Sequence, residues 1–493
     1  MATQGFTPEE RMLIDGELVQ AEGGRTYDNI NPATEEVIGV VADASAADMH
    51  RAIDAARRAF DETDWSTNKE LRKRVLRQLH DAIVEEKEEL RLELVAEVGT
   101  PLMVTNIAQL EGPLEDGLLY PIRMIDEFPF DRDMGVTAPM NGMMGQARRA
   151  VWKEPMGVVG SIVPWNYPFE VALNKIAQVL ATGNTTILKP APDTPWNATR
   201  LGRLVAEKTD MPAGVFNVVT TKDNMVAEEL TLSPKVDMIS FTGSTGVGKR
   251  IMEKGAPTLK RVFLELGGKS AAIYLDDADF EATVPMAGFG MCMHAGQGCA
   301  MQSRVLLPRS RYEEGVELIK AGMQGVPYGD PMNPENVMGP VVNKSQHEKI
   351  LNYIKIGQEE GARLVLGGSR PAHLEKGYFI EPTLFADVTN DMRIAREEIF
   401  GPVLCVIPYD DDEDAIRIAN DSNYGLSGGI FGSEPRATEM ARRLRTGSIA
   451  INGGMWYGAD MPYGGYKDSG VGRQNGVEGF EMYLETKIVA WPA

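Results

Sequence analysis

Short apolar runs alternate with longer amphipathic stretches over most of the chain. Past residue 150, the segments between the apolar runs have helical spacing, and the runs themselves predict strands at 158–163, 185–188, 215–219 and 238–241. The same alternation continues from residue 270 to about residue 445. Strands that alternate with helices predict parallel sheets with helices on both faces, and such sheets bind ligands at the carboxyl ends of their strands. We therefore expect an α/β protein with two units of this kind.

The N-terminal part of the chain has a different pattern. Residues 12–19 predict a strand, and apolar residues at helical spacing predict a helix over 44–60. A charged helix is predicted over 66–89, where Thr67 and Glu70 have the spacing of a capping box.

Two further segments stand apart from these patterns. Residues 131–149 are rich in methionine and glycine without a helical period, which fits a loose loop or a projecting hairpin, and residues 482–491 predict a strand. Both are candidates for contact between subunits.

Length, charge and cysteine content narrow the class of protein. A chain of 493 residues exceeds the usual size of a single core, so two or three structural units are expected. The net charge of −21 disfavours nucleic acid and anionic membranes as partners. Three cysteines cannot form a disulfide framework and fit a reducing compartment. Residues 1–10 lack the pattern of a signal peptide and no apolar run is long enough to span a bilayer, so we expect a cytoplasmic protein.

Cys299 is the first candidate for chemistry. It follows Gly296-Gln297-Gly298, and two glycines can hold a cysteine on an exposed, tight turn where its thiolate attacks a substrate. Taken alone, a cysteine is about three times more often a buried apolar residue than a nucleophile. Cys292 and Cys405 lie in apolar stretches and are expected to be buried in this way.

Glu265 and Asn166 are the next two candidates. Glu265 lies between leucines and before Gly267-Gly268, so partial burial would raise its pKa toward that of a general base; pairing with Lys269 is the alternative, and the residues alone do not separate the two. Asn166 follows the predicted strand 158–163, where its amide could donate to an oxyanion or simply cap the next helix.

The stretch from Phe241 to Lys249, FTGSTGVGK, follows a predicted strand and opens a helix. Glycines at such a turn leave backbone amides free to face a phosphate. It also matches the G-x-x-x-x-G-K part of a nucleoside-triphosphate loop, and residues 271–277 resemble a strand that ends in a magnesium-binding aspartate. This rival, a phosphoryl-transfer enzyme, lacks the expected Ser or Thr after Lys249, where Arg250 stands. It also gives Cys299 no role.

Metal chemistry is not predicted. The five histidines are scattered and no metal-binding spacing occurs. His294, five residues before Cys299, is expected to be a satisfied or pocket-lining histidine rather than a group that polarises the thiol.

Together these residues resemble the aldehyde dehydrogenase superfamily over nearly the whole chain. The motifs PWN, LKP, FTGST, ELGGK, GQGC, EEIFGPV and PYGGYKDSG occur in that order, and Cys299 lies 34 residues after Glu265 (299 − 265) and 133 after Asn166 (299 − 166). The resemblance implies that Cys299 forms a thiohemiacetal with an aldehyde and that Asn166 holds the oxyanion. It also implies that Glu265 activates the water that releases a free acid.

The resemblance also implies a bound NAD. The expected cofactor-binding residues are those of four motifs: Ile162, Val163, Pro164 and Trp165; Lys189; Gly243, Ser244, Thr245, Gly246, Val247 and Gly248; Leu266, Gly267, Glu398 and Phe400. Pro192 stands where NAD-preferring members often carry a glutamate that repels the 2′-phosphate of NADP. We therefore expect NAD with weak discrimination against NADP.

By the same resemblance, a neutral and largely aromatic substrate tunnel is expected. Its predicted residues are Tyr167, Val171, Phe289, Met293, Trp456, Tyr457 and Tyr463. They favour an apolar or aromatic aldehyde over succinic semialdehyde, and a betaine-type aldehyde is the alternative because aromatic boxes accept quaternary ammonium groups.

The resemblance completes the expected architecture. A Rossmann-like NAD(P)-binding domain is predicted over 1–130 and 151–264, a second α/β catalytic domain over 265–465, and a small β oligomerisation element from 131–150 and 466–493. The expected assembly is a homodimer or homotetramer.

Overall fold

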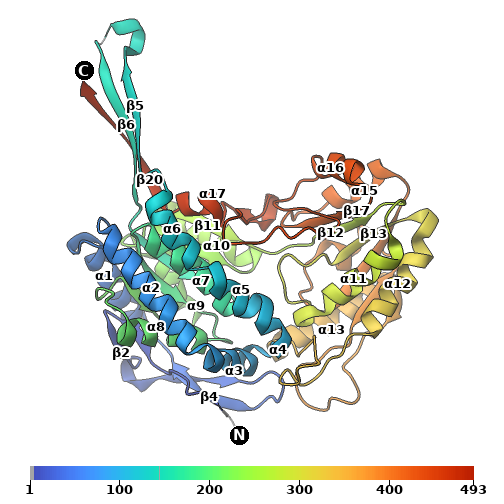
Figure 1. The fold of residues 1–493 in the computed structure, drawn as a ribbon. Coiled ribbons are helices and arrows are strands. Elements are labelled where there is room, and N and C mark those ends of the chain that lie inside the picture. The colour runs from blue at the N-terminus through green and yellow to red at the C-terminus, as the bar shows by residue number, and fades with distance from the viewer. Residues whose placement is uncertain (1–4, 144) are drawn as a thin grey trace.

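The protein consists of two α/β bodies with a long arm, and its structure is a computed structural model that describes residues 5–143 and 145–493 (Figure 1). Residues 1–4, part of the N-terminal stretch in which no signal peptide was expected, and residue 144 in the expected hairpin lie outside the described residues. The α/β class is confirmed.

The first body is built on an eight-stranded sheet with the order β19-β11-β10-β7-β8-β9-β1-β2. Its central strands are parallel, as predicted from the alternation. Their bounds are β7 (Val158–Ile162), β8 (Thr185–Lys189), β9 (Phe216–Val218), β10 (Met238–Thr242) and β11 (Arg261–Glu265), and β19 (Gly470–Val471) pairs antiparallel with β11. The four predicted strands are therefore confirmed to within two residues at each end.

The predicted strand over 12–19 is wrong in one respect, because it is a hairpin of two strands. Asp15 and Gly16 have φ angles of 57° and 80°, and this pair of left-handed residues makes the tight turn of a two-residue hairpin. The chain reverses there between β1 (Met12–Ile14) and β2 (Glu17–Val19).

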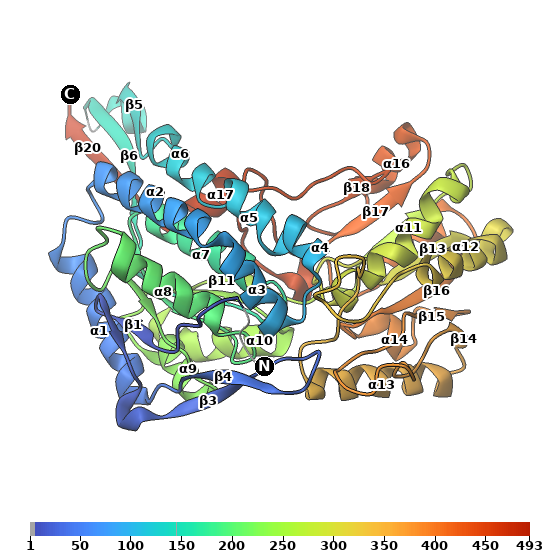
Figure 2. The ribbon, with the colours of Figure 1, turned by 60° about the horizontal axis from the view of Figure 1, so that its bottom comes forward.

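Two cores cover the two faces of this sheet. One contains apolar side chains of α1 (Ala46–Glu62), α9 (Asn224–Leu232) and α10 (Thr245–Gly255). The other contains those of α2 (Lys69–Glu85), α3 (Lys87–Val98), α6 (Leu119–Glu127), α7 (Pro168–Ala181) and α8 (Trp196–Lys208). In the views of Figures 1 and 2 these helices lie against the strands that they cover.

The helix predicted over 66–89 begins later than expected and its capping box is wrong. Asn68 is the N-cap of α2, and its side-chain oxygen accepts a hydrogen bond of 3.0 Å from the Leu71 amide. Asn68 therefore caps the helix one residue after Thr67, and it takes the amide of Leu71 instead of that of Glu70. The helix predicted over 44–60 is confirmed as α1, which has a capping box between Ser45 and Asp48.

The second body is built on a seven-stranded sheet with the order β14-β15-β16-β13-β12-β17-β18. All neighbours are parallel except β14 and β15. Its elements are β12 (Ala271–Tyr274), α11 (Phe280–Cys292), β13 (Arg304–Pro308), α12 (Tyr312–Gln324), α13 (Lys344–Glu359), β14 (Arg363–Leu366), β15 (Thr383–Ala386), α14 (Arg393–Arg396), β16 (Val403–Tyr409), α15 (Asp412–Asn420), β17 (Gly428–Phe431), α16 (Glu434–Ala441) and β18 (Ala450–Ile451). Two shorter helices lie between α3 and α6. In Figure 2, α4 (Leu102–Val104) lies next to the second body, and α5 (Glu111–Asp116) packs against α6 and α7 of the first.

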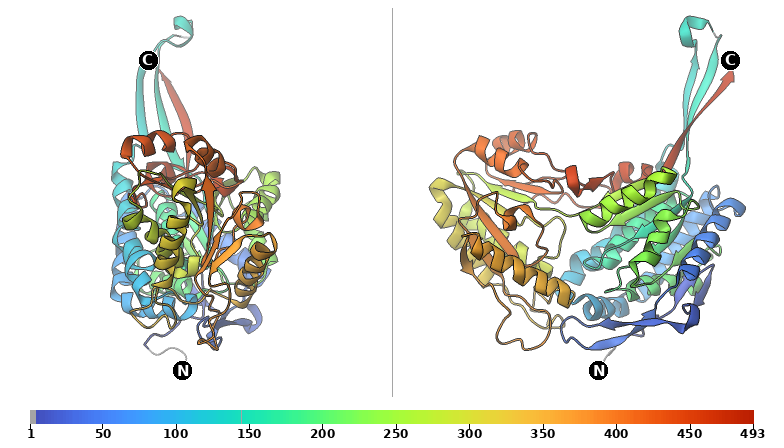
Figure 3. Two further views of the ribbon diagram at one scale, coloured as in Figure 1. Left: turned by 90° about the vertical axis from the view of Figure 1, so that its right-hand side faces the viewer. Right: turned by 180° about the vertical axis from the view of Figure 1, so that it is seen from behind.

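Of the two alternatives for residues 131–149, a loose loop or a projecting hairpin, the structure shows the hairpin. It forms β5 (Asp131–Thr137) and β6 (Ala147–Pro155), and the predicted C-terminal strand is confirmed as β20 (Leu484–Pro492) on the other side of β6. Figure 3 shows this three-stranded arm projecting from the body in both views. Of the stretch 466–493, only β20 joins the arm, because β19 pairs in the first sheet and α17 (Gly476–Glu481) packs against α7.

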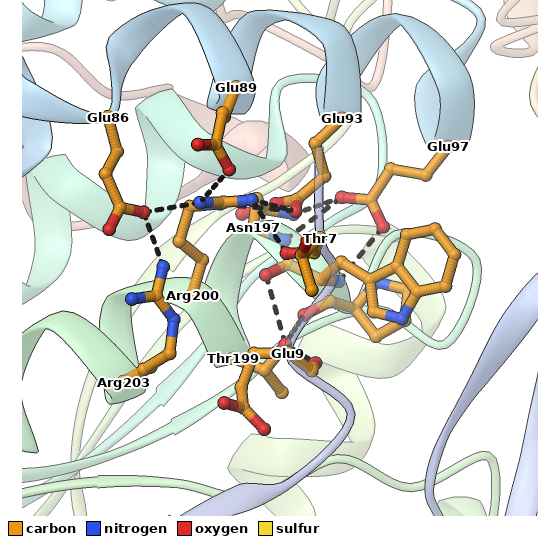
Figure 4. A network of polar contacts seen from close by, with 12 residues as sticks. Thr7, Glu9, Glu86, Glu89, Glu93, Glu97, Asn197, Thr199, Arg200 and Arg203 are labelled. Carbon is orange, nitrogen blue, oxygen red and sulfur yellow. Dashed lines mark hydrogen bonds and ion pairs between the residues drawn. The ribbon is translucent and has the colours of Figure 1, made fainter. Parts of the chain in front are cut away.

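A buried ion-pair network fixes the N-terminal segment to the first body (Figure 4). Arg200 on α8 contacts Glu93 on α3 at 3.0 Å and donates to the carbonyl oxygen of Thr7 at 3.2 Å. The Thr199 hydroxyl holds the carbonyl oxygen of Glu9 at 2.6 Å. Arg200 and Glu93 are both buried, so neither charge can exchange its partner for water. A separate hairpin, β3 (Thr26–Ile30) with β4 (Val37–Ala42), packs its apolar side chains beside this region.

In the part of the chain that the structure describes, no helix is both long enough and apolar enough to cross a membrane.

Candidate active site

Cys299 lies on a loop between the two bodies, just before β13. Three consecutive residues upstream, His294, Ala295 and Gly296, have φ angles of 49°, 52° and 67°. Left-handed backbone at two residues with side chains is strained and is typical of functional loops. A Cβ at Gly296 would stand 2.2 Å from the carbonyl oxygen of Gly401, so only glycine fits there. The loop leaves Cys299 partly exposed.

The other two cysteines differ from Cys299. Cys292 and Cys405 are both fully buried in the core of the second body, as predicted. Burial raises the pKa of the Cys292 thiol to about 12, which keeps it protonated and unreactive.

The thiol of Cys299 contacts two side chains that the sequence analysis had singled out separately. Its Sγ donates to Oε1 of Glu265 at 3.0 Å and lies 3.3 Å from the hydroxyl of Tyr463. The second carboxylate oxygen of Glu265 accepts from the Thr242 hydroxyl at 3.0 Å. Thr242 and Glu265 are register partners at the carboxyl ends of β10 and β11. The parallel sheet therefore aims a carboxylate at the sulfur.

The electrostatics of this pair favour a neutral thiol beside a carboxylate that can receive its proton. Burial and the charge of Glu265 both raise the pKa of Cys299, and the contact with Tyr463 lowers it. Burial raises the pKa of Glu265, while the contacts with Cys299 and Thr242 and the charge of Lys175 oppose that rise. Lys269, the alternative partner of Glu265, has a buried ammonium without a hydrogen-bond partner in the described chain.

Asn166 is held from two sides next to this pair. Its side-chain Nδ2 donates to the carbonyl oxygen of Gln297 at 2.8 Å, and its own carbonyl oxygen accepts from Nε2 of Gln109 at 2.6 Å and Nε2 of His294 at 2.8 Å. Helix α7 has Tyr167 as its N-cap residue, so capping by the Asn166 side chain is not the arrangement found.

His294 is satisfied at one ring nitrogen only: Nε2 is hydrogen-bonded, whereas the buried Nδ1 has no partner in the described chain. Burial lowers the pKa of its imidazole to about 4, so the ring is neutral at ordinary pH and donates one hydrogen bond to the Asn166 carbonyl. Its ring also packs edge-on against Tyr167, with centroids 5.1 Å apart. The sequence analysis had no signal for Gln109, which lies far upstream in the chain.

The glycine-rich turn lies at the start of α10. Ser244 is the N-cap residue of that helix, and its hydroxyl accepts from the Val247 amide at 3.4 Å. Gly246 has open space where a Cβ would stand, which leaves the first turn accessible to a phosphate. A Cβ at Gly248 would overlap Leu266, so this glycine allows the helix to pack on the sheet.

The same region argues against the nucleoside-triphosphate rival. Lys249 points to Asp468, with its Nζ 2.8 Å from that carboxylate, and Arg250 pairs with Glu228. Moreover, β12, the strand before Asp277, belongs to the second sheet and not to the sheet that holds β10. The expected magnesium-binding aspartate is therefore not placed beside the loop.

Gly268 and the second-body residues Glu398 and Phe400 line a pocket, which we call the cleft. The Glu398 carboxylate accepts from the Gly268 amide at 2.8 Å, and a Cβ at Gly267 would stand 2.5 Å from it. Phe400, whose φ is 64°, packs edge-on against Trp165 at a centroid distance of 5.3 Å. The strand ends of the first body and the Glu398–Phe400 loop thus face one another.

Lys189, at the end of β8, is buried, and its burial lowers the pKa of its ammonium to about 8. The nearby charge of Asp193 opposes that fall, and Asp193 itself accepts from Nδ2 of Asn343 at 2.9 Å. The carboxylate of Asp193, which follows Pro192, is therefore hydrogen-bonded to a residue of the second body.

Three predicted tunnel residues form one aromatic cluster at the thiol. Trp456 stacks on Tyr463 at 5.4 Å with an interplanar angle of 16°, and Tyr457 meets Tyr463 edge-on, also at 5.4 Å. Tyr463 in turn contacts the Cys299 sulfur. Phe289 and Met293 pack on the core of the second body and Val171 on that of the first, so their place in a tunnel stays a prediction.

Sequence reasoning missed two polar residues of α7 in this cluster. The Tyr457 hydroxyl donates to the Glu170 carboxylate and accepts from Nδ2 of Asn174 at 2.9 Å. Glu170 and Asn174 follow Tyr167 at three and seven residues, so helical spacing would have placed all three on one face.

In the described ranges 5–143 and 145–493, no group of three or more histidine, cysteine or acidic side chains is arranged to hold a metal ion.

A cysteine paired with a carboxylate, beside a glycine-rich turn at the carboxyl end of a parallel sheet, defines an enzyme that combines a thiol nucleophile with a nucleotide-type cleft. The model of the aldehyde dehydrogenase family matches residues 18–489, and the chain belongs to that family.

Relatives and solved structures agree with this assignment. The chain is 42% identical over 480 residues to 3-succinoylsemialdehyde-pyridine dehydrogenase of a Pseudomonas species, covering 97% of each chain. It matches the crystal structure of a Mycobacterium tuberculosis aldehyde dehydrogenase complexed with NAD⁺ at 41% identity, with a TM-score of 0.93 and 98% of each chain covered. Betaine aldehyde dehydrogenase of Staphylococcus aureus, also in complex with NAD⁺, matches at 36% identity with a TM-score of 0.93, covering 98% of this chain and 94% of that one.

Proposed function

We propose that this enzyme oxidises an aldehyde to the free carboxylic acid through a thioester on Cys299. The observation that carries the proposal is the 3.0 Å contact between the Cys299 sulfur and the Glu265 carboxylate. A carboxylate at that distance can take the proton of the thiol, and the resulting thiolate is the attacking species.

The steps follow from the positions of the chain's own groups. Glu265 takes the proton of Cys299, and the thiolate adds to the aldehyde carbon, forming the C–S bond of a thiohemiacetal. Asn166 uses one N–H on the Gln297 carbonyl and has a second N–H for the developing oxyanion. A bound dinucleotide supplies the acceptor for the hydride that leaves this carbon. Glu265 releases that first proton to solvent and then takes a proton from water, whose oxygen adds to the thioester carbon. The C–S bond breaks, the acid is released, and the departing Cys299 thiolate regains a proton from Glu265.

The residues of the cleft fit an NAD-type dinucleotide. Open space at Gly246 and the amides that begin α10 suit a pyrophosphate, with Ser244 beside it. Trp165 and Phe400 flank the cleft, Glu398 would hold the nicotinamide ribose, and Lys189 would reach the other ribose. The two NAD⁺ complexes named above share this fold.

We infer weak discrimination between NAD⁺ and NADP⁺. Pro192 offers no carboxylate to repel a 2′-phosphate, and Asp193 is engaged by Asn343. Measuring kcat/KM with both cofactors tests this inference. An NADP⁺ value several orders of magnitude below the NAD⁺ value would contradict it.

For the substrate we propose an apolar or aromatic aldehyde, because three aromatic rings stand at the thiol. A betaine-type aldehyde is the second candidate, since the same rings can hold a quaternary ammonium group. Turnover of benzaldehyde, betaine aldehyde and succinic semialdehyde compares these possibilities, and succinic semialdehyde is expected to be the poorest. Equal turnover of benzaldehyde and succinic semialdehyde would argue against the proposal.

We also propose a homodimer or homotetramer held together by the arm. The exposed side chains of β20, among them Ile488 at 75% exposure and Trp491 at 39%, would be covered in such an assembly. Sedimentation of the full chain and of an Ile488→Lys variant tests this, and a wild-type monomer would refute it.

The central experiment is an aldehyde panel assayed by NAD(P)H absorbance, with identification of the product acid. Cys299→Ala is expected to abolish turnover, while the matched change at a buried cysteine, Cys405→Ala, is expected to leave it measurable. Activity retained by Cys299→Ala would overturn the mechanism. A requirement for coenzyme A would overturn release of the free acid.

A further inference from the structure

Glu170 lies beside aromatic side chains and has no positively charged partner in the described chain. Its carboxylate accepts a hydrogen bond from the Tyr457 hydroxyl, and within the described ranges no positively charged side chain lies near enough to lower its pKa. The side chain of Glu170 is only partly exposed. Carboxylates of this kind are ordinarily paired with a positive group or freely hydrated, because desolvating a charge without a partner is costly.

Two tyrosines connect the carboxylate to the nucleophile. The path from the sulfur runs through the Tyr463 hydroxyl at 3.3 Å, from the Tyr463 ring to the Tyr457 ring at 5.4 Å, and from the Tyr457 hydroxyl to Glu170. Glu170 thus lies at the far end of the aromatic cluster from the sulfur. Burial raises the pKa of Glu170 to about 7; the charge of Glu265 adds to the rise, and the contacts with Tyr457 and Asn174 oppose it. A cation placed beside Glu170 would lower this pKa and keep the carboxylate charged.

The helix that carries Glu170 also orients the hydroxyl that contacts it. Asn174, one turn further along α7, donates from Nδ2 to the Tyr457 hydroxyl at 2.9 Å. The hydroxyl therefore accepts from Asn174 and directs its own proton to Glu170. The remaining acceptor sites of the carboxylate are available to a further donor, because the side chain is partly exposed.

We propose that Glu170 and Tyr457 form a distal subsite that selects aldehydes carrying a protonated amine at the end opposite the carbonyl. The carboxylate supplies the counter-charge and accepts the N–H groups, while the rings of Trp456 and Tyr457 supply aromatic faces for the cation. A substrate with a terminal carboxylate would instead be repelled. This inference rests on the proposed aldehyde oxidation. It keeps an apolar chain next to the thiol and adds a positive charge at the distal end of the aldehyde.

The test compares aldehydes of equal size and different charge. The ratio of kcat/KM for 3-aminopropanal to that for its neutral isostere butanal is measured in the wild type, in Glu170→Gln and in the surface control Glu281→Gln. We expect this ratio to fall by roughly tenfold in Glu170→Gln and to be unchanged in Glu281→Gln. An unchanged ratio in Glu170→Gln overturns the proposal.

A second pair of aldehydes distinguishes an N–H donor from a bare positive charge. The ratio of kcat/KM for 4-trimethylammoniobutanal to that for its neutral isostere 5,5-dimethylhexanal is measured in the same variants. In Glu170→Gln it should fall less than the ratio for the first pair, because a quaternary nitrogen donates no hydrogen bond. A larger fall for the quaternary pair would overturn the assignment of a protonated amine.

A binding measurement separates failure of this inference from failure of the proposed function. Cys299 is alkylated with iodoacetamide in the presence of n-butylammonium or n-butanol, which requires no turnover. Protection by n-butylammonium that exceeds protection by n-butanol, and that is lost in Glu170→Gln, supports the subsite even if no aldehyde is oxidised. Equal protection by the two compounds in the wild type overturns it even if aldehydes are oxidised.

Discussion

Replacing Tyr463 by phenylalanine isolates the contribution of one hydroxyl to the reactivity of Cys299. The hydroxyl lies 3.3 Å from the sulfur and lowers the pKa of the thiol, whereas burial and the Glu265 charge raise it. A hydrogen bond to a charged acceptor contributes about 1.5–3 kcal/mol, and one pKa unit corresponds to about 1.4 kcal/mol. Because sulfur at 3.3 Å is a weak acceptor, we take the lower limit and expect the pKa of Cys299 to rise by about one unit.

The assay is the rate of alkylation of Cys299 by iodoacetamide as a function of pH, because only the thiolate reacts. The midpoint should move to higher pH in Tyr463→Phe, while the stacking of the ring on Trp456 is retained. Tyr457→Phe is the matched control, since it removes a hydroxyl of the same cluster that points to Glu170 instead. The midpoint belongs to the coupled Cys299–Glu265 pair, so it is compared between variants and not assigned to one residue. A midpoint that stays in place or moves to lower pH would refute the reasoning.

Three further predictions concern the carboxylate and the fold. Glu265→Gln should lower kcat by about a hundredfold or more, because no base remains for the thiol and the water; stopped-flow assays showing wild-type kcat would rule this out. Thr242→Val removes the 3.0 Å hydrogen bond that lowers the pKa of Glu265, so the acid limb of the kcat profile should move to higher pH by up to about one unit. A shift to lower pH would contradict the assigned sign. Arg200→Ala leaves Glu93 buried without its partner and should cost about 3–5 kcal/mol of unfolding free energy in urea titrations. The exposed pair Arg58–Asp15 is the control, and Arg58→Ala should cost about 1 kcal/mol or less; equal losses would discount the buried network.

Periodicity was sufficient for the parts of the fold that local sequence determines. The central strands of the first sheet and helix α1 were predicted because each is an apolar run or stripe of ordinary length. The hairpin at Asp15-Gly16 and the Asn68 cap were missed because one residue with left-handed backbone or one side-chain acceptor decides them. Such choices change the pattern of apolar positions very little.

The candidate site was likewise predicted from the sequence only in part. Cys299, Glu265 and Asn166 carried a signal in their motifs, and the structure brings Cys299 and Glu265 into direct contact. Gln109 carried none, because it acts through Asn166, 57 residues away in the chain. Glu170 shares a helical face with Tyr167, but its contact with Tyr457 spans 287 residues and is not visible in that spacing. Contacts of that separation are set by the tertiary fold, which spacing within a motif does not describe.

The glycines of this site have a consequence for directed evolution. A Cβ at Gly268 would stand 2.4 Å from the carbonyl oxygen of Cys299, and the Gly268 amide holds Glu398. Gly296 meets the Gly401 backbone in the same way. The loop of the nucleophile and the loop of Glu398 are therefore joined backbone to backbone, and mutant libraries at these glycines would yield mostly inactive clones. Positions such as Pro192 and Glu170 lie outside this junction, so libraries there can vary cofactor and substrate choice separately.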